Sequence, residues 1–137
     1  MNRTIDRDAR WQGTFAEIRG LEIRAGQRLV LAPLESGPSL MQFITGSVIV
    51  MGAKSVLHVQ SGACLIIRTG TRMKMDVSSR VIVDPGAYVY IEHKADVQRA
   101  EKAGFVVAEG AHVGMPKALL GHVPDLRVAQ PLPLLPR

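Results

Sequence analysis

The chain of 137 residues has little cysteine and few aromatic residues. Its one cysteine, Cys64, excludes an internal disulfide. Phe, Trp and Tyr together make up 4% of the residues, whereas 47% are hydrophobic, so we expect an ordered core of aliphatic side chains. A chain of this length is expected to form one domain.

Long apolar runs are also missing. No stretch approaches the roughly 18 consecutive apolar residues of a membrane-spanning helix, so we expect no membrane span. The first eight residues carry charges with no apolar run behind them, which predicts that there is no signal peptide. We therefore expect a cytoplasmic protein or a part of a particle, and an extracellular one if the chain is a fragment of a longer secreted protein.

The usual signatures of catalytic and metal sites do not occur. The histidines lack metal-binding spacing: His58, His93, His112 and His122. Asp76 and Asp84 are eight residues apart and, as residues of successive repeat units, are not expected to lie on one face as a catalytic pair. The turn signal Asp84-Pro85-Gly86 gives Asp84 a structural role. We expect a protein that is not an enzyme and that holds no metal or cofactor.

The formal net charge of +5 suits an acidic partner. No basic run or aromatic stacking platform accompanies it, so we expect no nucleic-acid partner. The densest basic cluster provides the candidate contacts for an anion or an acidic glycan: Arg68, Arg72, Lys74 and Arg80.

A repeat of eight residues is the main feature that is present. Each unit begins with a small residue, and apolar residues follow three and five positions later. The clearest units begin at these positions: Gly62, Gly70, Ser78 and Gly86. The same register extends back to Met41 and forward to Met115. Chance does not explain agreement over so many units.

The spacing predicts a short strand and a corner in each unit. Apolar residues at i and i+2 lie on one face of a strand, and glycine permits the positive φ of a tight corner. Three units would form a triangular coil of about 24 residues. We predict an all-β protein with a parallel β-helix (β-solenoid) fold; the alternative is an antiparallel β-sandwich or jelly roll.

The predicted organisation is one β-repeat domain over residues 1–122. Residues 1–31 form an N-terminal cap and the first units, residues 32–40 a loop, and residues 41–115 the regular repeats. The cap includes Trp11 and Phe15. Residues 95–104 contain good helix formers and are expected to be a short helix or a bulging loop. Residues 123–137 are rich in Pro and Leu and are expected to form an extended tail.

Outward positions that are three units apart should stack on one face of such a coil. One face would carry Cys64 and Ile66, followed by Tyr88 and Tyr90 and then by His112, and is too apolar to face water. We predict an interface there, covered either by a partner or by the chain itself. The predicted interface residues are Ile66, Tyr88, Tyr90, Leu132, Leu134 and Leu135.

The units at Gly62-Ala63-Cys64-Leu65-Ile66-Ile67 and Pro85-Gly86-Ala87-Tyr88-Val89-Tyr90-Ile91 resemble a known repeat. They are similar to the P-G-A-x-L-x-I repeats of right-handed parallel β-helices in bacterial cell-surface and adhesin-type proteins. The likeness covers roughly residues 46–115. Bactofilins, which are cytoskeletal β-helix polymers, are a second resemblance, although their glycines recur within the strands. Such folds serve as adhesins, tailspikes, enzymes and scaffolds.

These features lead us to expect a structural protein that self-associates or decorates a filament, envelope or virion. Its main expected partner is another copy of itself. A carbohydrate-binding module or adhesin fragment that binds an acidic glycan is the first alternative. A small cupin-like metal enzyme is the second.

Overall fold

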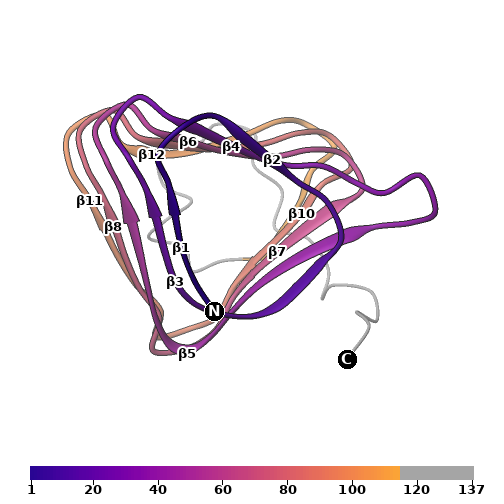
Figure 1. Cartoon of the computed structure of the whole chain (residues 1–137), viewed down its shortest axis with the longest axis horizontal. Coiled ribbons are helices and arrows are strands. Elements are labelled where there is room, and N and C mark those ends of the chain that lie inside the picture. Colours follow the sequence, from indigo (N-terminus) through magenta and orange to yellow (C-terminus); the bar gives the residue numbers. More distant parts are fainter. Residues whose placement is uncertain (115–137) are drawn as a thin grey trace.

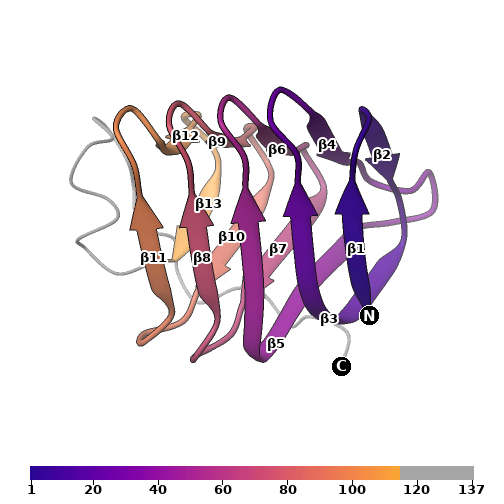
Figure 2. The same cartoon turned by 60° about the vertical axis from the view of Figure 1, so that its left-hand side comes forward.

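The computed structural model describes residues 1–114 and shows an all-β parallel solenoid of about four turns. Figure 1 looks down the solenoid, where successive coils superpose as a rounded triangle. Figure 2 shows β1, β3, β5, β8 and β11 side by side along one flank. All pairings between these strands are parallel, so the antiparallel sandwich alternative is wrong.

Three faces make up each coil, and long strands bend from one face to the next. The charged face consists of β1 (Asn2–Ile5), the end of β3 (Thr14–Ile23), the end of β5 (Ser39–Met51), β8 (Arg72–Met75) and β11 (Asp96–Arg99). The third face consists of β2 (Ala9–Trp11), β4 (Arg28–Leu31), β6 (Val56–Val59), β9 (Arg80–Val83) and β12 (Gly104–Val107). The tyrosine face consists of the starts of β3 and β5, with β7 (Ala63–Ile67), β10 (Tyr88–Ile91) and β13 (His112–Gly114).

The strand register confirms the predicted coil of three units. Val48 pairs with Arg72, and Arg72 pairs with Asp96, so each of these coils advances the chain by three eight-residue units. One coil earlier, Gly20 pairs with Val48, and that coil is half a unit longer. The extra length is due to the insertion at residues 32–38, which contains a bridge between Leu34 and Gly37 and protrudes from the coil in Figure 1.

From residue 52 onward, each described corner is a four-residue turn with a positive φ at its third residue. In the turn that starts at Asp84, the Ala87 N–H donates to the Asp84 carbonyl at 3.1 Å, and Gly86 has a φ of 80°. Pro followed by Gly is the preferred centre of such a type II turn, so this prediction is confirmed. The same position is occupied elsewhere by four residues that are not glycine: Lys54, Ser78, Lys94 and Lys102.

The inward side chains fill the solenoid with stacked aliphatic layers. Ile23, Met51 and Met75 lie above one another in successive coils and are at most 1% exposed. At the first coil, the rings of Trp11 and Phe15 lie 4.8 Å apart and pack against the same core. They belong to β2 and β3, so the predicted cap is part of the first coil itself.

The prediction of a helix or bulging loop over residues 95–104 is wrong. Residues 96–99 form β11, and Val97 pairs with Met73 in the charged face. Pairing with the preceding coil outweighs the helix propensity of the local sequence, which contributes only a few tenths of a kcal/mol per residue. The Gly104 N–H donates to the Ser79 carbonyl and begins β12, so this glycine does not end a helix.

Candidate functional site

The tyrosine face stacks its outward side chains in continuous rows. One row contains Leu40, Cys64, Tyr88 and His112, each paired with the next. A parallel row contains Ile66 and Tyr90. The rings of Tyr88 and His112 stack with their centroids 4.5 Å apart. The predicted interface residues Ile66, Tyr88 and Tyr90 therefore do lie together; that they form an interface stays a prediction.

The middle of this face is buried although its side chains point away from the core. Cys64 and Ile66 are each 2% exposed, and Leu40 is 6% exposed. These three residues form a hydrophobic cluster of their own, with Tyr88 and Tyr90 packed at its border. Burial raises the pKa of the Cys64 thiol to about 12, so the thiolate nucleophile is scarce at neutral pH.

The charged face has the same strand geometry but a different exposure. Its outward positions carry Val48 and Val50, then Arg72 and Lys74, then Asp96 and Gln98. Val48 is 47% exposed and Val50 is 37% exposed. This face is therefore open to solvent at the positions that are buried on the tyrosine face.

The four predicted basic contacts do not form one cluster. Arg72 and Lys74 share the charged face, whereas Arg80 begins β9 on the third face. Arg68 lies at the corner after β7, where its guanidinium donates to Gln42 Oε1 at 2.9 Å and lies 3.8 Å from Glu92 Oε2. A common anion or glycan site of all four residues stays a prediction, and the structure divides them over separate surfaces.

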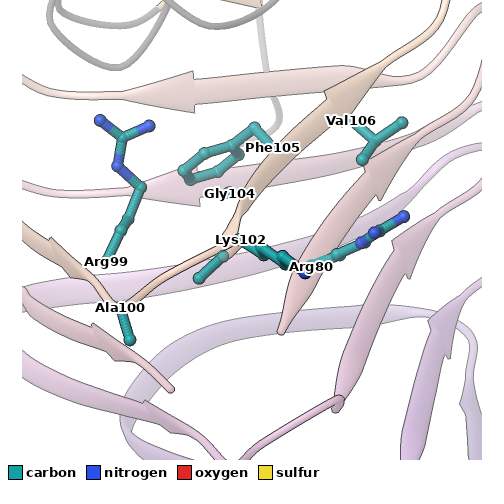
Figure 3. Close-up of a pocket in the computed structure, with 8 residues that line it drawn as sticks. Arg80, Arg99, Ala100, Lys102, Gly104, Phe105 and Val106 are labelled. Carbon is teal, nitrogen blue, oxygen red and sulfur yellow. The ribbon is translucent and has the colours of Figure 1, made fainter. Parts of the chain in front are cut away.

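A pocket of about 560 Å³ lies at the corner between β11 and β12, and three basic residues line it: Arg80, Arg99 and Lys102. Figure 3 shows the Arg80 and Arg99 guanidinium groups extending away from each other, with the Phe105 ring beside Arg99. The cations therefore line a stretch of surface and do not converge on one point.

The structure also shows a side-chain pair that the sequence reasoning missed. His58 Nε2 on β6 lies 2.8 Å from Asp84 Oδ1 in the next coil, and both side chains are partly exposed. The two residues are 26 residues apart, which is one 24-residue coil plus two residues. The coil length therefore places them close together in adjacent coils, and the sequence could have indicated the pair. Among the described residues, no group of three or more His, Cys, Asp or Glu side chains could hold a metal ion.

Three predicted interface residues, Leu132, Leu134 and Leu135, fall outside the described residues, so their role stays a prediction. Residues 1–114 contain no helix that is long and apolar enough to cross a membrane.

The fold is a parallel β-solenoid, which is the class of protein that the repeat predicted. The chain matches no protein-family model, no curated protein and no solved structure at a significant level. Its function therefore has to be inferred from the solenoid and its surfaces.

Proposed function

We propose that this protein is a non-enzymatic structural protein that self-associates through the end of its solenoid. The observation that supports this most is the state of the last coil. Within residues 1–114, no strand pairs with the outer edges of β11, β12 and β13. Unpaired strand edges are templates for another chain, because their N–H and C=O groups can continue the ladder.

The backbone donors of the last coil alternate in direction. The N–H groups of Asp96 and Ala100 donate to the preceding coil at 2.8 and 2.9 Å. In a parallel strand the intervening odd residues direct their N–H groups to the opposite edge, so the Val97 N–H points away from the preceding coil. A second copy that adds a strand there would accept this hydrogen bond.

The inner layer of the last coil supports the same proposal. Val97 and Val107 point inward and are only half-buried, whereas their partners Met73 and Val83 are 1% and 0% exposed. Phe105 and Val113 also belong to this layer and are buried, and Arg99 takes the inward position that pairs with Met75. A stacked copy would cover the half-buried valines and add hydrophobic contact, worth about 25 cal/mol per Å² of apolar surface.

Val97→Pro tests this proposal while leaving the other strand pairings in place. Proline removes the outward N–H and sterically blocks an added strand, while the hydrogen bonds to β8 remain. Val97→Thr is the control, since it keeps the N–H and the side-chain shape. We expect sedimentation velocity to give a smaller mass for Val97→Pro than for Val97→Thr. Equal masses for two folded variants would contradict association through β11.

Binding of an acidic glycan is a second candidate, supported by the basic pocket. Arg80 and Lys102 line it, and Arg72 and Lys74 lie on the adjoining charged face. Binding to an acidic glycan array should be lost in the double variant Arg80→Ala, Lys102→Ala if the pocket is the site. It should be lost in Arg72→Ala, Lys74→Ala if the charged face is the site. An absence of binding by the unaltered protein would remove this candidate.

A further inference from the structure

The two ends of the solenoid carry inward side chains of different size in the same rows. One row begins with its smallest side chain and ends with its largest: Ala9, Leu29, Leu57, Val81 and Phe105. A second row begins at Trp11 and ends at Val107. A third row begins at Phe15 and ends at Val113. In each row one end coil has a large residue and the other a smaller one, so the two ends are complementary in shape.

The charges at the two ends are also complementary. The first corner, between β1 and β2, carries the exposed carboxylates of Asp6 and Asp8. The last corner between the same two faces joins β11 to β12 and holds the basic pocket, which Arg99 and Lys102 line (Figure 3). Both corners have the same place in their coils, because Ile5 before the first corner and Arg99 before the last share a row. Carboxylates at one end therefore correspond in position to cations at the other.

The backbone groups of the two end coils alternate in the same phase. The Ile5 carbonyl of β1 accepts a hydrogen bond from the Arg24 N–H of the second coil, and the Ala100 N–H after β11 donates to the preceding coil. Alternate residues of a strand direct their backbone groups to opposite edges, so Thr4 presents its groups at the outer edge of β1 and Val97 presents its groups at the outer edge of β11. A parallel pair between β11 and the β1 strand of another copy would continue the ladder in phase.

We infer that the last coil of one copy stacks on the first coil of a second copy in the register of successive coils. This inference rests on the proposed self-association and names the surface that meets the end of the solenoid. Phe105 would lie against the small Ala9 of the second copy. The Asp6 and Asp8 carboxylates of that copy would enter the basic pocket. An inward charge such as Arg99 ordinarily discourages stacking on a strand edge, and these carboxylates would offset it. A join between two different ends that advances along the solenoid axis does not close, so we expect an open filament.

Exchanging the charges at the two ends tests this join. Asp6→Lys and Lys102→Glu each place like charges at the join, and we expect each variant alone to associate about tenfold more weakly than the native protein. An equimolar mixture should recover the native mass distribution in sedimentation velocity, because the altered end of each variant fits an end of the other. The control Glu35→Lys makes the same charge change in the protruding insertion and should associate like the native protein. Native association of Asp6→Lys would overturn the inference, since two last coils that face each other do not involve Asp6.

Disulfide formation locates the join directly. Arg10 and Val106 begin and end one outward row, so the join would place them one strand spacing, about 5 Å, apart. In a Cys64→Ala background, Arg10→Cys and Val106→Cys should form a disulfide-linked dimer when they are mixed and oxidised, and neither should do so alone. A dimer in Val106→Cys alone would overturn the inference in favour of two last coils that face each other.

The failure of this join can be told apart from the failure of self-association. A mass that rises with concentration, without a cross-link in the mixture, would overturn the join while self-association stands. A mass of one chain at every concentration would overturn both.

Discussion

The tyrosine face and the charged face are built from the same eight-residue unit, yet their outward side chains meet different surroundings. Ile66 on the first is 2% exposed, and Val50 on the second is 37% exposed. Both faces have parallel strands of four or five residues in the regular coils and the same inward aliphatic layers. The inward residues of a unit thus determine the coil, while the outward residues determine what each face can bind.

Placing a charge on each face gives the largest expected contrast. Ile66→Asp would bury a carboxylate with no partner, and we expect it to lower the free energy of unfolding by about 4 kcal/mol. Val50→Asp puts the same group at a solvated position and should change the free energy of unfolding by less than about 0.5 kcal/mol. Urea unfolding followed by circular dichroism measures both. Similar losses in the two variants would remove the distinction between the faces.

The corners next to the two faces give the second contrast. The turns that lead into the tyrosine face have glycine at the positive-φ position, as at Gly62 and Gly86, whereas Lys94 takes this position where the chain passes to the charged face. A Cβ at Gly86 would also lie 2.5 Å from Ser61 Oγ. We expect Gly86→Ala to destabilise the protein by about 2 kcal/mol and Lys94→Gly to stabilise it by about 0.5 kcal/mol. Thermal unfolding should give a lower melting temperature for Gly86→Ala and a higher one for Lys94→Gly than for the native protein. A lower melting temperature for both variants would contradict this account of the corners.

The pH dependence of stability should report the burial of Cys64. The folded chain keeps the thiol proton up to a pKa of about 12, whereas the ordinary value is 9.0. Its contribution is therefore complete below pH 9 and is lost as the pH rises toward 12. The free energy of unfolding of the native protein, taken relative to that of Cys64→Ala, should fall by about 1.4 kcal/mol between pH 8 and pH 10. A constant difference would mean that the thiol is accessible to water.

The smallest expected contrast is at the last residue of the turns. Ala87 holds this position where the chain enters the tyrosine face, whereas Ser55 and Ser79 hold it where the chain leaves the charged face. Ser79 Oγ donates to the Asp76 carbonyl at 2.8 Å, but the buried Ser55 Oγ has no hydrogen-bond partner within residues 1–114. Ser79→Ala should cost about 1 kcal/mol, and Ser55→Ala should be neutral or stabilising. Equal losses in chemical unfolding would show that Ser55 also makes a hydrogen bond.

The fold could be predicted because the inward residues repeat at a fixed spacing. The shift between Leu31 and Met41 and the turn at Asp84 were both readable from local sequence. Residues 96–99 were not, because β11 has one strong inward apolar residue, Val97, and forms through its pairing with β8. Local sequence could not indicate positive φ at Lys102, which the stack of equivalent corners imposes.

The period of the repeat predicted which outward side chains share a row, but not how exposed those side chains are. The coil length placed Cys64, Tyr88 and His112 in one row, and the structure confirms that row. The period predicted that Ile66 points outward, but it could not predict that this side chain is only 2% exposed. The distribution of the basic residues also depends on which face each strand occupies, so neighbours in sequence such as Lys74 and Arg80 are on different faces.

The mass of the purified protein over a hundredfold range of concentration tests the proposed self-association most directly. An exposed strand edge predicts a mass that rises with concentration, or an assembly already larger than one chain of 14.9 kDa at the lowest concentration. A single mass of one chain over the whole range would contradict self-association through the end of the solenoid.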